Sequence, residues 1–107
     1  VVTDQKNNPS WTTAVSQAIR HCIIMGAEGL FHYGSDDVLS RYEFAGLIAE
    51  VFDLDATYIH KTTTSKLNQK APRPKNSSLN VSKIIRETGV QTYTTDYCLH
   101  QIRRLQH

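Results

Sequence analysis

The sequence is poor in residues that cross-link a fold or anchor it: its 107 residues include two cysteines, one methionine and three prolines. Cys22 and Cys98 lie far apart with no CxxC spacing, so buried free thiols are expected rather than a disulfide or a metal pair. Unbroken apolar runs are only a few residues long, which excludes a membrane-spanning helix. No basic leader with an apolar stretch opens the chain, so we predict a cytoplasmic protein without membrane contact.

Motifs that bind a dinucleotide or perform catalysis are also missing. No GxGxxG follows a strand, and no GxxxxGK[ST] loop occurs. None of the five tyrosines is followed four positions later by a lysine. Asp36-Asp37 suits a turn better than acid/base catalysis, and Asp96 with His100 suits an ion pair on a helix surface better than a metal site. We therefore predict no catalytic, cofactor-binding or metal-binding residue in this chain, and no enzyme activity for the chain alone.

Charge is spread unevenly, although the net value is only +2. The first 55 residues hold three basic and eight acidic groups, whereas the remaining residues hold nine basic and two acidic groups. The stretch 61–86 carries seven Lys or Arg residues and no Asp or Glu. Such a run is either a solvated basic face or a site for phosphate, from a nucleotide-sugar diphosphate or from a nucleic-acid backbone.

Hydrophobic periodicity predicts a mixed α/β chain of about four helices and short strands. Ser40-Arg41-Tyr42-Glu43 is a capping box, and the apolar stripe of the helix that follows is wide enough to be covered on two sides. Pro72 and Pro74 hold the basic segment 62–78 extended around Arg73. Helices are expected at about 12–25, 40–52, 81–88 and from 94 or 95 onward, and strands at 1–3, 30–33 and 57–61.

Four stretches resemble, in the right order, the C-terminal part of the dTDP-4-dehydrorhamnose reductase family of extended short-chain dehydrogenases. One departure is Asn7, which stands where the family usually has a glycine; asparagine tolerates the left-handed backbone better than most residues. The matching stretches are Asp4-Gln5 with Pro9-Ser10, Gly29-Leu30-Phe31-His32, Ser40 with Tyr42-Glu43-Phe44-Ala45, and Arg73-Pro74-Lys75-Asn76-Ser77-Ser78-Leu79 followed by Ser82-Lys83.

The resemblance implies that residues 1–107 are a single C-terminal substrate-binding domain of a Rossmann-type fold, and a fragment without its N-terminal dinucleotide-binding domain. The N-terminal half of this family binds NADPH and holds a Tyr-x-x-x-Lys pair, while the C-terminal lobe closes over the nucleotide sugar. The implied function is reduction of a 4-keto nucleotide sugar in dTDP-rhamnose synthesis. NADPH is expected as the cofactor of the full-length protein, with none in the fragment.

By resemblance, Arg73 approaches the diphosphate, and a guanidinium on a proline-stiffened loop is a good bidentate phosphate ligand. The alternative for Arg73 is a salt bridge to the acidic first half of the chain. Asn76 and Ser77 either hydrogen-bond phosphate or close a turn. Lys75 adds to the attractive field, and Gln5 either touches substrate or is a turn residue. These five residues are the predicted substrate-binding set.

Two other functions compete with the reductase. One is a non-catalytic regulatory protein, because the β subunit of methionine adenosyltransferase looks similar through this region. The other is a nucleic-acid-binding module, which is weaker because only Tyr58 lies near the basic stretch as a stacking aromatic. The expected partners are therefore a nucleotide-diphosphate sugar and the N-terminal Rossmann domain of the same protein, with a homodimer possible and no nucleic acid.

Overall fold

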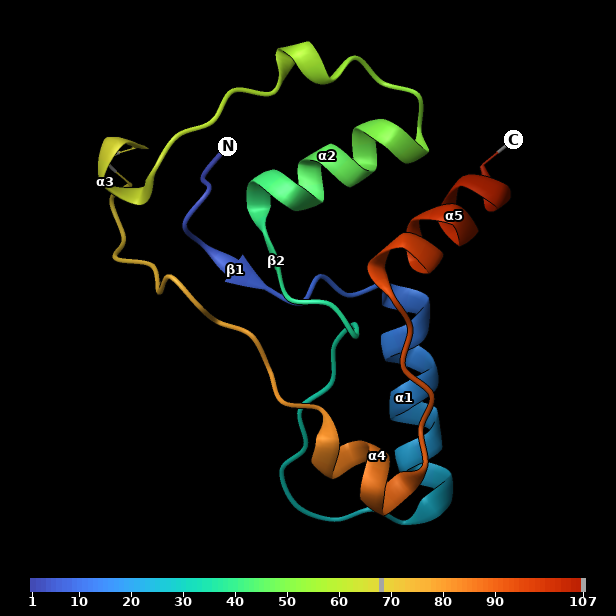
Figure 1. Cartoon of the computed structure of the whole chain (residues 1–107). Coiled ribbons are helices and arrows are strands. Elements are labelled where there is room, and N and C mark those ends of the chain that lie inside the picture. Colours follow the sequence, from blue (N-terminus) through green and yellow to red (C-terminus); the bar gives the residue numbers. More distant parts are fainter. Residues whose placement is uncertain (68, 107) are drawn as a thin grey trace.

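The computed structural model describes residues 1–67 and 69–106 and shows helices joined by long connections, with little sheet (Figure 1). It confirms the predicted mixed lobe of about four helices with short strands. The elements, in chain order, are β1 (Lys6–Asn7), α1 (Thr12–Met25), β2 (Leu39–Ser40), α2 (Arg41–Val51), a 3-10 helix (Ala56–Tyr58), α3 (Thr64–Leu67), α4 (Ser82–Thr88) and α5 (Thr95–Leu105).

The four predicted helices form within a residue or two of their expected bounds, because their end signals are local. Ser40 and Glu43 make a complete capping box at the start of α2. Gly26 ends α1 with φ of 65°, a left-handed conformation that glycine adopts without strain. Thr94 caps α5 by accepting a hydrogen bond from the Tyr97 backbone N–H. Asn80 directly precedes Val81, the N-cap residue of α4, and its side chain accepts from the Ser82 N–H.

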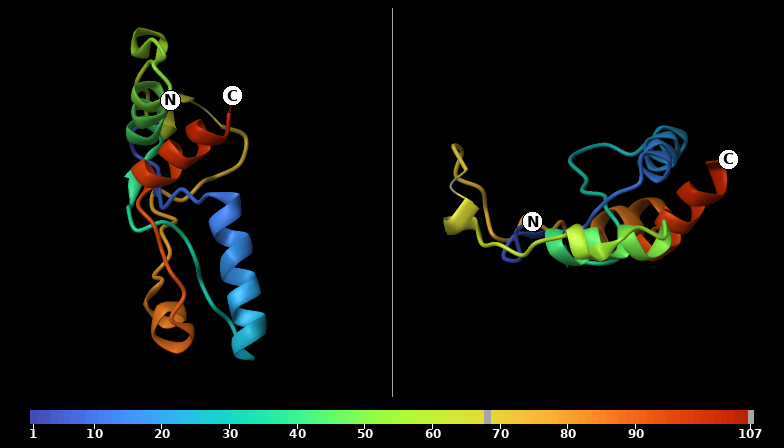
Figure 2. Two further views of the ribbon diagram at one scale, coloured as in Figure 1. Left: turned by 90° about the vertical axis from the view of Figure 1, so that its right-hand side faces the viewer. Right: turned by 90° about the horizontal axis from the view of Figure 1, so that it is seen from above.

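The helices lie in two groups. α2 packs against α5, and α1 packs against α4. The views in Figure 2 show α1 and the connection after it standing off from the layer that holds the other helices. A small apolar core of Ala18, Ile84 and Val90 joins α1 to α4 and the segment beyond it. Both cysteines are free, and Cys98 is buried as predicted, whereas Cys22 is only half-buried.

Two predicted strands do not form. The segment 30–33 lies in no helix or strand. The segment 57–61 begins instead with the 3-10 helix, because the Asp55 carboxylate accepts hydrogen bonds from the backbone N–H and the hydroxyl of Thr57 and so stabilises a local turn. The basic segment also contains one unpredicted helical turn, α3.

The N-terminal strand prediction is partly right. Val2 pairs with Thr62 in a single parallel bridge, supported by the backbone bonds from Thr3 N–H to Thr62 carbonyl and from Thr62 N–H to Val1 carbonyl. The first regular strand comes a few residues later, as β1. Asn7 lies in this strand opposite Leu39, and its φ is not positive. The expected left-handed turn at Asn7 is therefore wrong, and no glycine is required there.

Among the described residues, no helix has the length and apolar character that crossing a membrane requires.

Candidate functional site

The basic segment is held beside the start of α2 by backbone pairing. The Lys6 N–H donates to the Lys75 carbonyl at 2.7 Å, and the Ser77 N–H donates to the Lys6 carbonyl at 2.9 Å. On its other side, Lys6 pairs with Ser40 in the two-stranded antiparallel sheet. β1 therefore lies between residues 75–77 and β2, and it fixes the loop that carries Arg73 next to the first turn of α2.

A small hollow opens where these three segments meet. Its volume is about 80 Å³. Three of the lining residues carry a positive charge and none is an Asp or Glu, which makes the hollow suited to an anion. The lining residues are Gln5, Lys6, Asn7, Arg41, Arg73, Pro74 and Ser77.

The structure brings three of the five predicted site residues to this hollow: Gln5, Arg73 and Ser77. Lys75 and Asn76 lie on the same loop outside the lining. The Asn76 carboxamide oxygen accepts from the Ser78 N–H at 3.0 Å, which is the turn-closing alternative. Lys75 contributes its carbonyl to the pairing with Lys6, and its side chain adds positive charge near Asp4.

Arg73 is exposed and available to a ligand. The ion pairs found among residues 1–67 and 69–106 join His100 to Asp96 and Arg103 to Asp53. The alternative of a salt bridge from Arg73 to the acidic first half is therefore not seen in the described part of the chain. The guanidinium is instead presented to solvent from an irregular segment between two prolines.

Beside the hollow, the side chains of Asp4 and Gln5 connect the start of the chain to α3. The Gln5 side chain is buried, and its amide nitrogen donates to the Thr64 hydroxyl at 3.3 Å and to the Gln69 carboxamide oxygen at 3.0 Å. The Asp4 carboxylate accepts from the Thr64 hydroxyl and backbone N–H. These bonds, the hydroxyl first, lower the pKa of Asp4 below its ordinary value. Gln5 thus combines a place in the lining with a role in holding α3.

Sequence reasoning missed Arg41 and Lys6. Arg41 is the first residue of α2, and the motif match treats its position as variable. Lys6 is a single basic residue in an acidic half of the chain. The pairing of β1 with β2 brings Lys6 close to Arg41, and the single bridge between Lys6 and Asn76 brings both beside the loop of Arg73. Pairing that short leaves no usable pattern in the sequence.

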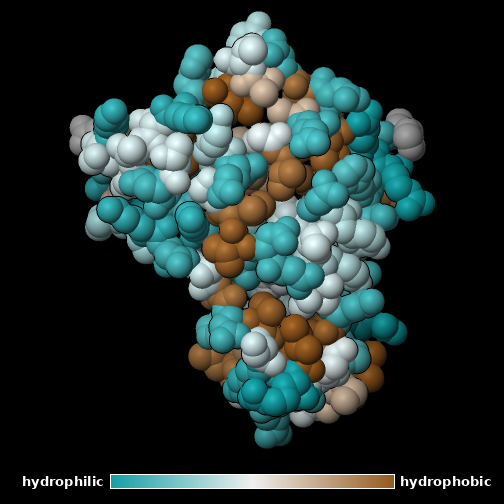
Figure 3. Space-filling view, in the orientation of Figure 1, coloured by the Kyte–Doolittle hydropathy of each residue, from teal (hydrophilic) through white to brown (hydrophobic). Residues whose placement is uncertain are grey.

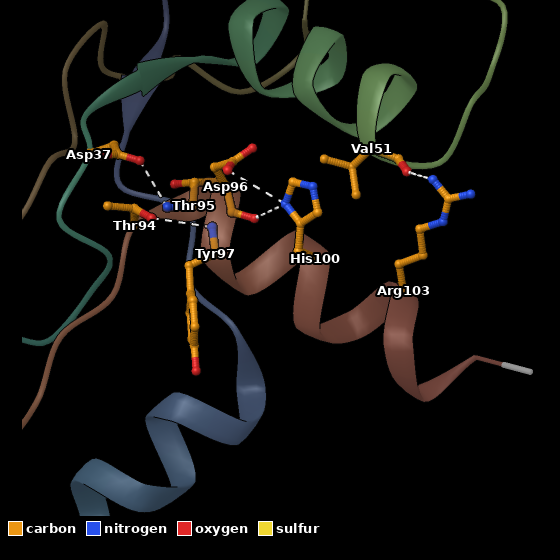
Figure 4. A network of polar contacts seen from close by, with 8 residues as sticks. All are labelled: Asp37, Val51, Thr94, Thr95, Asp96, Tyr97, His100 and Arg103. Atoms are coloured by element: carbon orange, nitrogen blue, oxygen red, sulfur yellow. Dashed lines mark hydrogen bonds and ion pairs between the residues drawn. The ribbon is translucent and has the colours of Figure 1, made fainter.

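The acidic residues near α5 have structural roles (Figure 4). The Asp37 carboxylate accepts from the Thr95 N–H at 2.8 Å and so ties the 36–37 turn to the start of the helix. His100 lies 3.5 Å from the Asp96 carboxylate on the exposed face of α5, and Arg103 donates to the Val51 carbonyl of α2. The contact between His100 and Asp96 is the side-chain pair on a helix surface that the sequence predicts.

Comparison with known proteins identifies the family. The model of the RmlD substrate binding domain matches residues 1–104. The chain is 32% identical over 94 residues to the probable low-salt glycan biosynthesis reductase Agl14 of Haloferax volcanii, covering 88% of this chain and 31% of that protein. It is 26% identical over 85 residues to the β subunit of methionine adenosyltransferase 2 of Danio rerio, covering 75% of this chain and 26% of that protein.

Solved structures show the same fold. A dTDP-4-dehydrorhamnose reductase of Bacillus anthracis, solved in complex with NADP, superposes with a TM-score of 0.89 at 22% identity over 98% of this chain and 37% of that one. An orthologue of this reductase from Clostridium acetobutylicum gives a TM-score of 0.86 at 27% identity over 100% of this chain and 38% of that one. The chain thus spans about a third of the length of the proteins it matches. It belongs to the RmlD substrate binding domain family, with the fold of the C-terminal part of the dTDP-4-dehydrorhamnose reductases.

Proposed function

We propose that this chain is the substrate-binding part of an NADPH-dependent reductase that acts on a 4-keto nucleotide sugar, and that the hollow between β1, α2 and the 73–77 loop binds the diphosphate. The observation that carries the proposal is the convergence of Lys6, Arg41 and Arg73 on one small hollow without an acidic neighbour in its lining. A diphosphate presents several anionic oxygens, and two guanidinium groups offer planar paired donors that match them.

The remaining lining residues complete the proposed role. The Ser77 hydroxyl lies at the edge of the hollow and donates weakly, at 3.4 Å, to the Lys6 carbonyl, so it is free to turn toward a phosphate oxygen. Lys75 and Asn76 hold the loop in register, and Lys75 adds to the attractive field. NADPH is expected to bind outside these residues, since the sequence contains no glycine-rich dinucleotide motif. A cytoplasmic location and a homodimer remain predictions.

Substitution of Arg73 tests the proposal. Arg73→Ala should weaken the binding of dTDP or inorganic pyrophosphate about tenfold, the loss of one pair of charge-assisted hydrogen bonds. Arg73→Lys should restore only part of the affinity, because a lysine keeps the charge but not the paired geometry. Isothermal titration of each variant at fixed salt concentration measures the effect, and Arg41→Ala should show a similar loss.

Arg86→Ala is the matched control. Arg86 is an exposed arginine in the last turn of α4, within the same basic half of the chain but outside the hollow. Its removal lowers the net charge by the same amount and should leave the affinity within about twofold, as expected for a screened surface charge. If Arg73→Ala and Arg86→Ala lower the affinity equally, the basic segment attracts anions only through its overall positive charge. That result would contradict a specific site.

The second candidate is a non-catalytic regulatory protein. It is favoured by the matches to the β subunit of methionine adenosyltransferase 2, which include 35% identity over 57 residues in the rat protein, covering 53% of this chain and 17% of that one. Both candidates use the same lobe, so the hollow does not separate them. A Tyr-x-x-x-Lys pair upstream of Val1 favours the reductase, and its absence favours the regulatory protein.

A further inference from the structure

A second polar hollow lies between α1 and residues 89–94, the connection from α4 to α5. Its volume is about 420 Å³, which is within the range of about 300–1,000 Å³ that is usual for sites of small organic ligands. Figure 3 shows apolar residues gathered over the end of the molecule that holds α4 and the C-terminal end of α1. This hollow differs from those surroundings, because polar side chains make up most of its lining: Gln17, Arg20 and His21 of α1, and Gln91 and Tyr93 of the connection.

The polar hollow lies on one side of α1 only. Successive residues of a helix turn by about 100°, so Gln17, Arg20 and His21 lie on one side of α1. Ile19 and Ile23 lie on the opposite side, where they line a separate apolar hollow. The polar hollow is therefore distinct from the apolar one and shares none of its lining residues.

Hydrogen bonds hold the polar side chains of the hollow in place. The Nε2 atom of His21 donates to the Thr88 carbonyl. Since a carbonyl oxygen can only accept, the neutral His21 ring carries its proton on Nε2 and leaves Nδ1 as an acceptor. The Tyr93 phenol contacts the carboxamide oxygens of Gln17 and Gln91, at 3.3 and 3.4 Å, and donates to them. These bonds join α1 to the connection and position four side chains around the hollow.

The groups of the hollow that remain unused are donors. Both carboxamide oxygens face the Tyr93 phenol, and the amide NH₂ groups of Gln17 and Gln91 have no partner within residues 1–67 and 69–106. The exposed Arg20 makes no hydrogen bond or ion pair in the described part of the chain. No lining residue is an Asp or Glu, so the hollow offers one guanidinium and two amides to an anionic ligand.

The charge of this hollow differs from that of the hollow at Arg73. Three cations line that hollow, whereas Arg20 is the single Lys or Arg in this lining. One guanidinium matches one carboxylate, whose two oxygens accept its paired N–H groups, and it does not balance the several charges of a diphosphate. Carboxamides both donate and accept, as hydroxyl groups do, so Gln17 and Gln91 suit hydroxyl groups beside the carboxylate.

We propose that the hollow between α1 and the connection 89–94 binds a hydroxylated monocarboxylate of the size of a sugar acid. Arg20 binds the carboxylate, and Gln17 and Gln91 bind the hydroxyl groups. The site shares no residue with the hollow at Arg73, so the proposal goes beyond the proposed function and does not depend on it. A bound acid bridges α1 and the connection ahead of α5, and it therefore stabilises the folded protein.

Titration calorimetry with glucuronate tests the proposal, and glucose is the matched probe because it has the same ring and hydroxyl groups without the carboxylate. Glucuronate should bind saturably and at least about tenfold more tightly than glucose, as expected for one pair of charge-assisted hydrogen bonds. Arg20→Gln should lower the affinity for glucuronate about tenfold for the same reason. The absence of saturable binding up to about 10 mM glucuronate would overturn the proposal.

Two further variants separate a specific site from general attraction of anions. Arg86→Ala, at an exposed arginine of α4 outside the hollow, should leave the affinity for glucuronate within about twofold. Arg73→Ala should also leave it within about twofold, because the two hollows are separate. An equal loss of glucuronate binding in Arg20→Gln and in either of these variants would contradict the site.

Measurements on the same samples complete the test. Arg20→Gln should keep the Tm of the free protein within about 1 °C, since Arg20 is exposed, so a loss of affinity reports the contact and not unfolding. Inorganic phosphate that binds as tightly as glucuronate and loses the same affinity in Arg20→Gln would show a general anion site and refute the assignment to a carboxylate. Failure of dTDP binding with intact glucuronate binding removes the proposed function alone and leaves this site in place.

Discussion

Asn8 joins three segments that are far apart in the sequence. Its carboxamide nitrogen donates to the carbonyls of Ser35 and Leu79 at 3.2 and 3.3 Å, and its oxygen accepts from the Leu79 N–H at 3.1 Å. The residue is only 9% exposed. A Cβ added at Gly34 would lie 2.5 Å from the Asn8 nitrogen, so the glycine is needed for the close approach. Asn8 thus anchors the end of the basic segment to the turn before β2.

Replacing Asn8 by alanine should destabilise the protein by about 1–3 kcal/mol, because the buried Ser35 carbonyl and the part-buried N–H and carbonyl of Leu79 lose their partner. Urea unfolding measures the change. The control is Asn80→Ala, which removes one exposed hydrogen bond to the Ser82 N–H and should cost less than about 1 kcal/mol. Equal costs for the two variants would mean that Asn8 does not hold the segments together.

Three residues of the candidate site, Arg73, Gln5 and Ser77, were predictable from the sequence, and Arg41 and Lys6 were not. Arg73 stands between two prolines in a stretch without acidic residues, so its exposure follows from the local sequence, whereas its proposed role as a phosphate ligand came from the family resemblance. Gln5 and Ser77 came from the family resemblance and also reach the hollow. Arg41 and Lys6 depend on tertiary pairing of Lys6 with Ser40 and with Asn76, which lie far from it in the sequence, and neither periodicity nor composition indicates such pairing.

At the scale of the element, α2 shows how a local signal fixes a helix. The Ser40 hydroxyl accepts from the Glu43 N–H at 3.0 Å, and the Glu43 carboxylate accepts from the Ser40 N–H at 2.9 Å. The second bond is the larger cause of a pKa for Glu43 below its ordinary value. Because the folded state holds the proton less tightly than the unfolded state, the carboxylate contributes stability when it is ionised.

Glu43→Gln should reveal this contribution as a pH-dependent difference in Tm. The stabilisation by Glu43 is complete above the ordinary glutamate pKa of about 4.3 and is lost as the pH falls through the lower folded value. The difference in Tm between wild type and Glu43→Gln should therefore be constant near neutral pH and shrink below about pH 4.3. A difference that stays unchanged down to pH 3 would assign it to the shape of the side chain rather than to its charge.

Helices were predicted better than strands for a physical reason. The signals at Ser40, Gly26, Gly89 and Thr94 act within one turn of chain, and all four structures form. A strand requires a partner, which sequence periodicity does not supply. At 57–61 the Asp55 side chain stabilises a competing turn, whereas at 30–33 the pattern of a strand is present and no partner lies within the described residues. The strand predicted at 57–61 is therefore replaced by another structure, whereas the segment 30–33 only lacks a strand to pair with among the described residues.

At the scale of the whole molecule, the apolar core is small for the length of the chain. Its central cluster consists of Ala18, Ile84 and Val90, and the half-buried Phe31 and Tyr33 pack against it. Burial raises the pKa of Tyr33 to about 12, with the phenol donating to the Gln91 carbonyl at 2.9 Å. The helices are therefore set by their local end signals more than by a large apolar core.

The proposed function predicts that this chain alone binds a nucleotide but does not catalyse the reduction. The 107-residue chain should bind dTDP through the hollow at Arg73 yet oxidise no NADPH in the presence of a 4-keto nucleotide sugar, because no glycine-rich dinucleotide motif and no Tyr-x-x-x-Lys pair occur in its sequence. Titration calorimetry measures the first property, and the absorbance of NADPH measures the second.

The proposed longer protein, in which a dinucleotide-binding domain precedes this chain, is the positive control for turnover. Its Arg73→Ala variant should raise KM for the nucleotide sugar about tenfold with little change in kcat, as expected when a contact that is equally strong in the ground state and the transition state is lost. NADPH oxidation by the 107-residue chain alone would refute the separation. If the longer protein also fails to oxidise NADPH while it still binds dTDP, the reductase proposal is wrong. The regulatory candidate then takes its place, because a protein that binds a nucleotide without catalysing a reaction acts through its binding partners.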